Sequence, residues 1–72
     1  MIELLVAYIE DHVKHLGYAV YVIQGTIIIR KERLDGVLSV SWAISQIDVR
    51  QLRHEVLFAL ADGKIKQVVA LE

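Results

Sequence analysis

The chain contains no cysteine, so neither disulfide bridges nor a cysteine-based metal site can stabilise its fold. At 72 residues it has room for one hydrophobic core and not for two. We therefore expect a single domain spanning residues 1–72, stabilised by its own core or by a partner.

Long apolar runs are also missing. Unbroken apolar segments, such as those from Leu4 to Ile9 and from Tyr18 to Ile23, are far shorter than the roughly 18 residues that a membrane-spanning helix needs. The chain opens with Met1-Ile2-Glu3, without the basic start of a secretory signal. These absences predict no membrane contact and a cytoplasmic location, or an equivalent compartment such as the interior of a virion.

Catalytic signatures are absent as well. The four glycines are isolated from one another, so no phosphate-binding loop is present. Ser39, Ser41 and Ser45 alternate along a predicted strand with no histidine beside them. His12 and His15 have a spacing at which a helix can present two metal ligands, but the sequence indicates no third ligand. We predict no enzymatic activity, no cofactor and no metal.

Apolar residues, in contrast, are in excess. Hydrophobic residues make up 56% of the chain and the mean hydropathy is +0.47. A domain of this size cannot comfortably bury so much apolar surface. Net charge is −1, so no overall field attracts nucleic acid or acidic lipid. This balance favours self-association.

Residues 2–16 have the pattern of an amphipathic helix. Glu10 and Lys14 are spaced for an i,i+4 ion pair, and Gly17 follows where a left-handed residue would end the helix. Apolar residues recur at spacings of three and four: Ile2, Leu5, Val6, Ile9, Val13 and Leu16. The apolar surface is widened beyond this stripe by Leu4, Ala7 and Tyr8.

Residues 18–45 are rich in Val, Ile and Tyr and contain two turn signals, Gln24-Gly25 and Asp35-Gly36. They predict three antiparallel strands joined by two tight hairpins. The alternative is one long strand that passes through Gly25 as a bulge and pairs with the last strand.

The two predicted loops fix the strand register. A loop at Gln24-Gly25 pairs Val22 with Ile27, and a loop at Asp35-Gly36 pairs Ile29 with Trp42. Both registers place the same residues on the core face of the sheet: Val20, Val22, Ile27, Ile29, Leu38, Val40, Trp42 and Ile44.

A second helix is predicted to begin at Asp48 as N-cap, with Gln51 as its capping-box partner, and to end at Gly63. Residues 64–71 fit either a strand or two helical turns, and their β-branched residues favour the strand. The predicted apolar stripe of this helix consists of Val49, Leu52, Val56, Ala59 and Leu60.

These elements predict an α+β fold of order α-β-β-β-α, with a possible fourth strand at the C-terminus. A three-stranded antiparallel meander would carry both helices on one face. The opposite face would then carry Tyr21, Ile23 and Ile28, and in a monomer this face is exposed to solvent. Together with Leu4 and Tyr8 they form the candidate self-association surface of a homodimer.

The function that these patterns favour is a non-enzymatic protein-interaction module with an accessory or regulatory role. The alternative is a nucleic-acid-binding domain. It would use Arg30, Lys31 and Arg33 in the second hairpin, together with Arg50 and Arg53 near the start of the second helix. Charges at the end of a hairpin also keep it soluble, which favours the first function.

Overall fold

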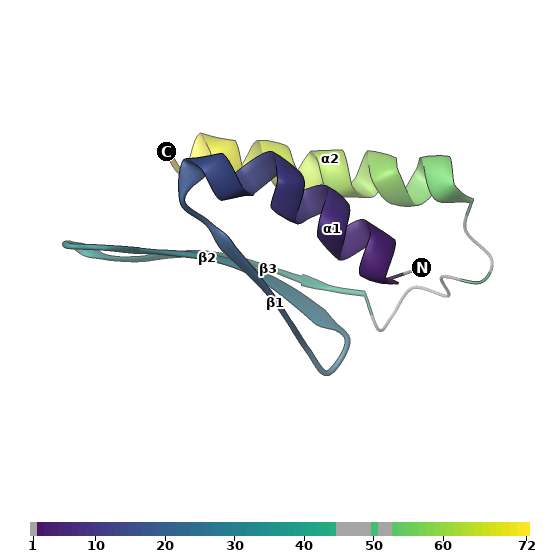
Figure 1. Cartoon of the computed structure of the whole chain (residues 1–72), viewed down its shortest axis with the longest axis horizontal. Coiled ribbons are helices and arrows are strands. Elements are labelled where there is room, and N and C mark those ends of the chain that lie inside the picture. The colour runs from purple at the N-terminus through teal and green to yellow at the C-terminus, as the bar shows by residue number, and fades with distance from the viewer. Residues whose placement is uncertain (1, 45–49, 51–52) are drawn as a thin grey trace.

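The computed structural model describes residues 2–44, 50 and 53–72, which form a helix, three strands and a helix (Figure 1). The predicted α+β class and element order are confirmed. The possible fourth strand is wrong, because the residues near the C-terminus belong to the last helix. The elements are α1 (Ile2–Val13), a short 3₁₀ turn η1 (Lys14–Leu16), β1 (Ala19–Ile23), β2 (Thr26–Arg33), β3 (Gly36–Ala43) and α2 (His54–Ala70).

Both helices lie over the same face of the sheet, as predicted, so the described chain has two layers (Figure 1). α1 and α2 lie side by side and run in the same direction, above a sheet of order β1-β2-β3. The hydrophobic core fills the space between the layers. It consists of Leu5, Ile9, Val13, Tyr18, Ile27, Ile29, Trp42, Ile44, Leu57, Ala61 and Val68.

The first helix ends where the sequence predicts. Gly17 adopts a left-handed conformation with φ 88°, and its N–H donates a 3.0 Å hydrogen bond to the carbonyl of Lys14. A side chain at this φ is strained, which explains the choice of glycine. The amphipathic pattern of α1 is also confirmed, since Leu5, Ile9 and Val13 are buried on one side.

The first hairpin has the predicted loop and register. Gln24 and Gly25 both have positive φ, 48° and 74°, as the central residues of a type I′ turn require. Val22 therefore lies opposite Ile27, and Val20 opposite Ile29. The alternative of one long strand through Gly25 is wrong.

The second hairpin differs from the prediction by two residues in its register. Its loop is Leu34-Asp35 instead of Asp35-Gly36, so Arg33 lies opposite Gly36. Among the described residues other than glycine only Gln24 has positive φ, so Asp35 does not adopt the conformation that a type I′ loop at Asp35-Gly36 needs. Gly36, with φ 143°, instead follows the loop, a position where glycine is common after a type I turn.

A shift of two residues preserves the face of every side chain, because side chains alternate with a period of two. Ile29 lies opposite Val40, where the sequence predicted Trp42, and Trp42 lies opposite Ile27 instead. The predicted core face of the sheet is therefore correct, although the predicted pairs between β2 and β3 are not.

The second helix differs more from its prediction. The structure describes it from His54, with Arg53 as N-cap and no side-chain capping hydrogen bond at that residue. The predicted capping box of Asp48 and Gln51 lies outside the described residues, as do Val49 and Leu52 of the predicted stripe. The other three stripe residues, Val56, Ala59 and Leu60, are exposed, so this stripe is wrong.

The buried face of α2 consists of Leu57, Ala61 and Val68, with Ile65 half-buried between them. These spacings of three and four continue one helical stripe past Gly63, so the predicted helix end and the strand over 64–71 are both wrong. Packing of Val68 and Ile65 on the core outweighs the cost of about 1 kcal/mol for a glycine inside a helix.

Candidate interaction surfaces

The outer sheet face is the surface of the sheet that points away from the helices. Its apolar end is formed by Tyr21, Ile23 and Ile28, with Tyr21 opposite Ile28 and Ile23 opposite Thr26. Tyr21 and Ile23 are 51% and 57% exposed, and Ile28 is half-buried. No described element covers this face (Figure 1). Toward the second hairpin the face becomes polar, with Arg30 opposite Ser39 and Glu32 two residues further along β2.

The two other candidate self-association residues lie elsewhere, on α1. Leu4 is 59% exposed. Tyr8 is half-buried against its own chain, where its ring lies 4.9 Å from that of Phe58 and its hydroxyl donates a 2.6 Å hydrogen bond to Asp62. The hydrogen bond to Asp62 raises the pKa of Tyr8. The five predicted residues therefore fall on two surfaces, and the contacts of Tyr8 join α1 to α2.

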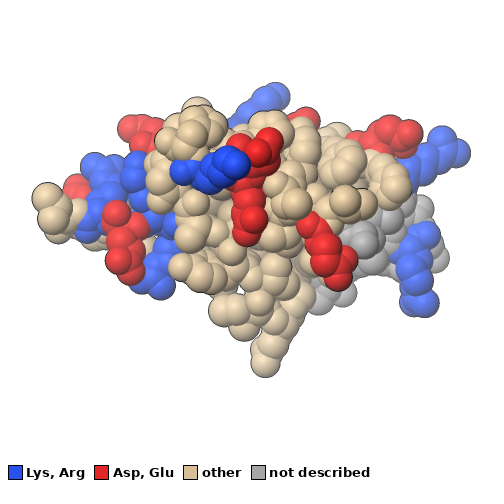
Figure 2. All heavy atoms as spheres, in the orientation of Figure 1, with Lys and Arg blue, Asp and Glu red and all other residues tan. Residues whose placement is uncertain are grey.

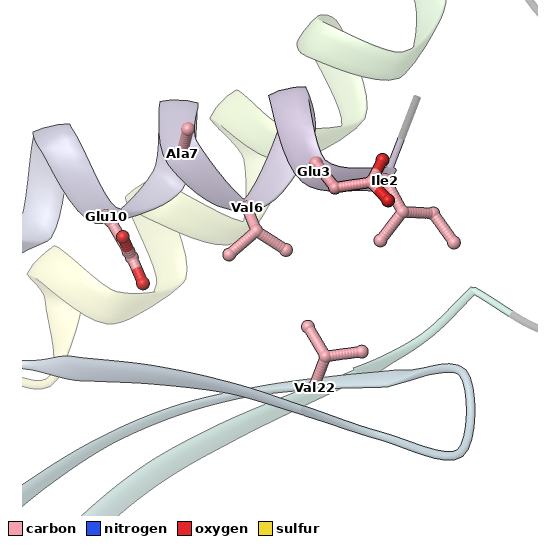
Figure 3. Close-up of a pocket in the computed structure, with 6 residues that line it drawn as sticks. All are labelled: Ile2, Glu3, Val6, Ala7, Glu10 and Val22. Carbon is pink, nitrogen blue, oxygen red and sulfur yellow. The ribbon is translucent and has the colours of Figure 1, made fainter.

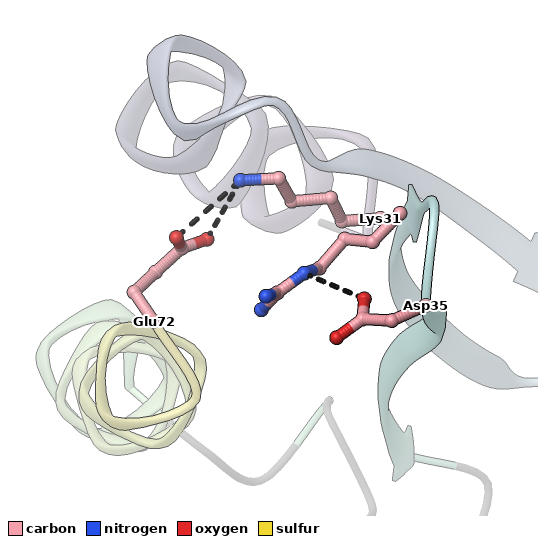
Figure 4. A network of polar contacts seen from close by, with 4 residues as sticks. Lys31, Asp35 and Glu72 are labelled. Atoms are coloured by element: carbon pink, nitrogen blue, oxygen red, sulfur yellow. Dashed lines mark hydrogen bonds and ion pairs between the residues drawn. The ribbon is translucent and has the colours of Figure 1, made fainter.

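Basic residues in the second hairpin are paired within the chain. Lys31 lies 3.1 Å from Glu72 (Figure 4), Arg33 lies 3.2 Å from Asp35, and Arg30 bonds to Glu32, also at 3.2 Å. Alternation along β2 also separates them, because Arg30 points to the outer sheet face whereas Lys31 and Arg33 point to the helix side.

Arg53 is the N-cap of α2, and Arg50 precedes it by three residues in the sequence. The start of α2 lies at the opposite end of the molecule from the second hairpin (Figure 1). The longest dimension of the structure is 41 Å. Acidic and basic side chains are interleaved at the hairpin end in the view of Figure 2. The structure thus does not bring the five predicted nucleic-acid contacts into one basic patch.

Tyr18 lies beneath the pair of Lys31 and Glu72. It is 5% exposed, and burial raises the pKa of Tyr18, an effect to which the negative charge of Glu72 adds. The ammonium group of Lys31 lies 5.7 Å from the centre of the Tyr18 ring, within the range of a cation–π contact. This cluster fastens the end of the chain to the sheet.

The two histidines of the first helix do not converge on a common site. Nδ1 of His12 lies 2.8 Å from the backbone oxygen of Tyr8, one turn earlier, and its ring is 4.4 Å from the Tyr8 ring. His15 is exposed. Within the described residues no group of three or more His, Asp or Glu side chains is placed to hold a metal ion.

A second surface, which we term the edge groove, lies between α1 and β1. Its volume is about 380 Å³. Val6 of α1 and Val22 of β1 point toward one another across it (Figure 3), and Val22 is 45% exposed although it is on the core face of the sheet. The lining residues are Ile2, Glu3, Val6, Ala7, Glu10 and Val22.

Two carboxylates line the edge groove. The pKa of Glu3 is lowered by a hydrogen bond from its own backbone at the start of α1. The predicted pair of Glu10 with Lys14 is wrong, because Lys14 lies 3.4 Å from Asp11 instead. Glu10 is exposed and has no ion pair with another described residue. The groove is thus apolar inside and acidic at its rim.

The edge groove is not predicted by the sequence pattern. The pattern of Glu3, Val6 and Glu10, at spacings of three and four, indicates that they share a helical face. It does not indicate that this face lies beside a strand, because that requires knowing that β1 is at the edge of the sheet.

The described residues form a small α+β unit with one open sheet face and with β1 and β3 at the two edges of the sheet (Figure 1). Comparison of the chain with protein-family models, with curated proteins and with solved structures gives no match. Neither α1 nor α2 is long and apolar enough to cross a membrane, and these are the helices in the described part of the chain.

Proposed function

We propose that this protein is a non-enzymatic interaction module of the cytoplasm, with an accessory or regulatory role, that forms a homodimer through its outer sheet face. The observation that carries the proposal is the exposure of Tyr21 and Ile23, each more than half accessible, beside Ile28 on a face that no described element covers (Figure 1). Large β-branched and aromatic side chains gathered on one open face are typical of a contact surface.

The size of the outer sheet face bears on the strength of such a dimer. The three strands have five, eight and eight residues. At about 3.4 Å per residue and about 4.8 Å between strands, they present roughly 340 Å² per copy. A standard stable interface buries about 800 Å² per partner. We therefore expect a weak, micromolar dimer.

The accessible surface of the chain, 4981 Å², exceeds the value of about 4,500 Å² expected for a compact monomer of its mass.

Charge also favours a two-fold arrangement centred on the apolar end. A two-fold axis through the patch of Tyr21 and Ile28 would stack these side chains on their copies. The charged pair of Arg30 and Glu32 would lie away from the axis and stay in water. Burying one isoleucine contributes roughly 1.5 to 3 kcal/mol, so a few such contacts can offset the entropy of association.

Sedimentation of the intact protein over a range of concentrations tests the proposal. We expect a dimer at high micromolar concentration, and a monomer for Ile23→Lys under the same conditions. Val69→Lys is the matched control, because Val69 is 52% exposed and lies on α2, in the other layer. A monomeric wild type at all concentrations would reject the dimer. Equal effects of both substitutions would reject the outer sheet face as its interface.

A further inference from the structure

The hydrogen-bonding directions in the sheet show which backbone groups of β1 are open. The N–H of Ile44 donates a 2.9 Å hydrogen bond to the carbonyl of Gly25, just before β2. Because bonding direction alternates along a strand, the odd-numbered residues of β2 then bond toward β3 and the even-numbered residues toward β1. The first hairpin agrees, since its loop-flanking residues Ile23 and Thr26 are a hydrogen-bonded pair in a two-residue turn.

The partners of the even-numbered residues of β2 are the odd-numbered residues of β1. Tyr21 faces Ile28, and Ala19 faces Arg30. The N–H and C=O groups of Val20 and Val22 therefore point to the opposite side, away from β2. Since β1 pairs with β2 alone among the described strands, these four polar groups lie on an open edge.

This open edge runs beside the edge groove. The side chain of Val22 lines the groove (Figure 3). Its N–H and C=O point outward along the sheet plane, as the register requires. A strand that hydrogen-bonded to Val20 and Val22 would therefore place every second side chain beneath α1, next to Val6. Addition of a strand to an exposed edge is an established mode of peptide recognition, in which pockets for alternate side chains give specificity.

We propose that the open edge of β1 and the edge groove together bind an extended peptide segment of a partner protein as a fourth strand. The segment carries an apolar side chain flanked by a basic residue two positions to either side. The apolar side chain fills the groove between Val6 and Val22, and the basic side chains meet Glu3 and Glu10.

The spacing of the two carboxylates fits this pattern. Glu3 and Glu10 are seven residues apart on α1, which corresponds to about 10.5 Å along the helix. Side chains four residues apart on a strand are separated by about 13 Å. The flexible stems of lysine or arginine span the small difference. A basic, apolar, basic alternation on one face of the peptide thus matches an acidic, apolar, acidic groove.

The same charges argue against a second copy of this chain at the edge groove. Antiparallel pairing of β1 with its own copy would bring two Glu3 and two Glu10 side chains to one interface, and none of the described residues that line the groove is a lysine or arginine. Like charges placed together oppose association. The inference therefore extends beyond the homodimer, which uses the outer sheet face and leaves the edge groove accessible.

The experiment uses a synthetic, fluorescently labelled peptide with valine at its centre, lysine two positions to either side, and threonine or serine elsewhere. Binding to the intact protein is followed by fluorescence anisotropy, and amide hydrogen exchange is followed residue by residue by NMR. A second peptide, with glutamate in place of both lysines, is the charge control. Glu10→Gln is compared with Asp11→Asn, the same change one residue away and outside the groove lining.

We expect saturable, salt-sensitive binding of the lysine peptide and none of the glutamate peptide. Glu10→Gln should weaken binding about two- to fivefold, the usual range for one exposed ion pair, and Asp11→Asn should leave it unchanged. The amides of Val20 and Val22 should exchange rapidly in the free protein and slow about tenfold or more in the complex. Binding without this protection, equal binding of both peptides, or no binding at millimolar peptide would overturn the proposal.

Discussion

The ammonium group of Lys31 lies 3.1 Å from the carboxylate of Glu72, so an ion pair joins the middle strand of the sheet to the end of the chain (Figure 4). Both side chains are about a third exposed or less, 26% and 31%. This partial burial sets the pair apart from that of Arg30 and Glu32, whose side chains are 47% and 78% exposed.

Substitution Glu72→Gln should lower the free energy of unfolding by about 0.5 to 1 kcal/mol, because it removes a partly shielded ion pair. Glu32→Gln is the control and should change stability less. Urea unfolding at low and high salt measures both, and the loss for Glu72→Gln should shrink at high salt. A loss that is equal for the two variants, or independent of salt, would contradict a stabilising role of the Lys31 pair.

Stability should also decrease in alkaline solution. The pKa values of Tyr8 and Tyr18 are raised above the ordinary 10.0, by the hydrogen bond to Asp62 and by burial respectively. A raised pKa means that the fold favours the protonated phenol, so the contribution is complete below pH 10.0 and is lost as pH rises through the folded-state pKa.

We therefore expect the free energy of unfolding to fall above about pH 10, and to fall less steeply in Tyr8→Phe and in Tyr18→Phe. Urea unfolding at a series of pH values measures the slope, and tyrosinate absorbance reports the ionisation. An unchanged slope in both variants would show that these two hydroxyls are not its source.

Trp42 is the only tryptophan and lies on the core face of the sheet, 8% exposed and opposite Ile27. Its fluorescence should be blue-shifted in the folded protein. Trp42→Ala should cost about 3 to 5 kcal/mol, a large part of the roughly 5 to 15 kcal/mol that stabilises a small domain. Trp42→Phe retains most of the packing and should cost less. Emission typical of water-exposed tryptophan would contradict this placement.

The sequence predicts the sheet better than the second helix, for a physical reason. Strand faces depend only on alternation, so the two-residue error at Leu34-Asp35 left Trp42 and Ile29 on the correct side. A helical stripe has no such tolerance. The predicted stripe through Val56 and Leu60 differs from the observed stripe through Leu57 by one residue, which rotates the helix by about 100°.

Local sequence signals also gave a wrong prediction for residues 64–71, because Gly63 and the pair Val68-Val69 by themselves disfavour a helix. Contact of Val68 with a core assembled from distant segments decides the outcome, and no local pattern contains that information. No local pattern predicts the edge groove either. Its residues Val6 and Val22 are separated in the sequence, and only the strand order brings them together.

The two faces of β2 predict opposite results for neighbouring isoleucines. Ile29 is fully buried, whereas Ile28 points to the outer sheet face and is half-buried. Ile29→Lys would place an unpaired charge in the core and should unfold the protein, because such burial costs several kcal/mol. Ile28→Lys should remain folded and lose dimer mass. Circular dichroism and light scattering measure both variants, and a well-folded Ile29→Lys would reject the assignment of the sheet faces.

Two glycines provide the last test, because the structure gives them opposite roles. Gly63 lies inside α2 with open space where a Cβ would be, whereas Gly17 has φ 88° and a Cβ there would lie 3.3 Å from Cε of Lys31. Gly63→Ala should therefore raise the free energy of unfolding by about 0.5 to 1 kcal/mol, since alanine favours the helix and restricts the unfolded chain.

Gly17→Ala should lower the same free energy by about 1 to 2 kcal/mol, because an L-residue is strained in the left-handed region. Thermal and urea unfolding of the two variants beside the wild type measures both changes, and the helical signal in circular dichroism should rise slightly for Gly63→Ala. If the chain instead left the helix at Gly63, as its local sequence suggests, alanine there would bring no gain in helix or would destabilise the protein. A gain for Gly63→Ala with a loss for Gly17→Ala would separate a glycine in a helix interior from one that ends a helix.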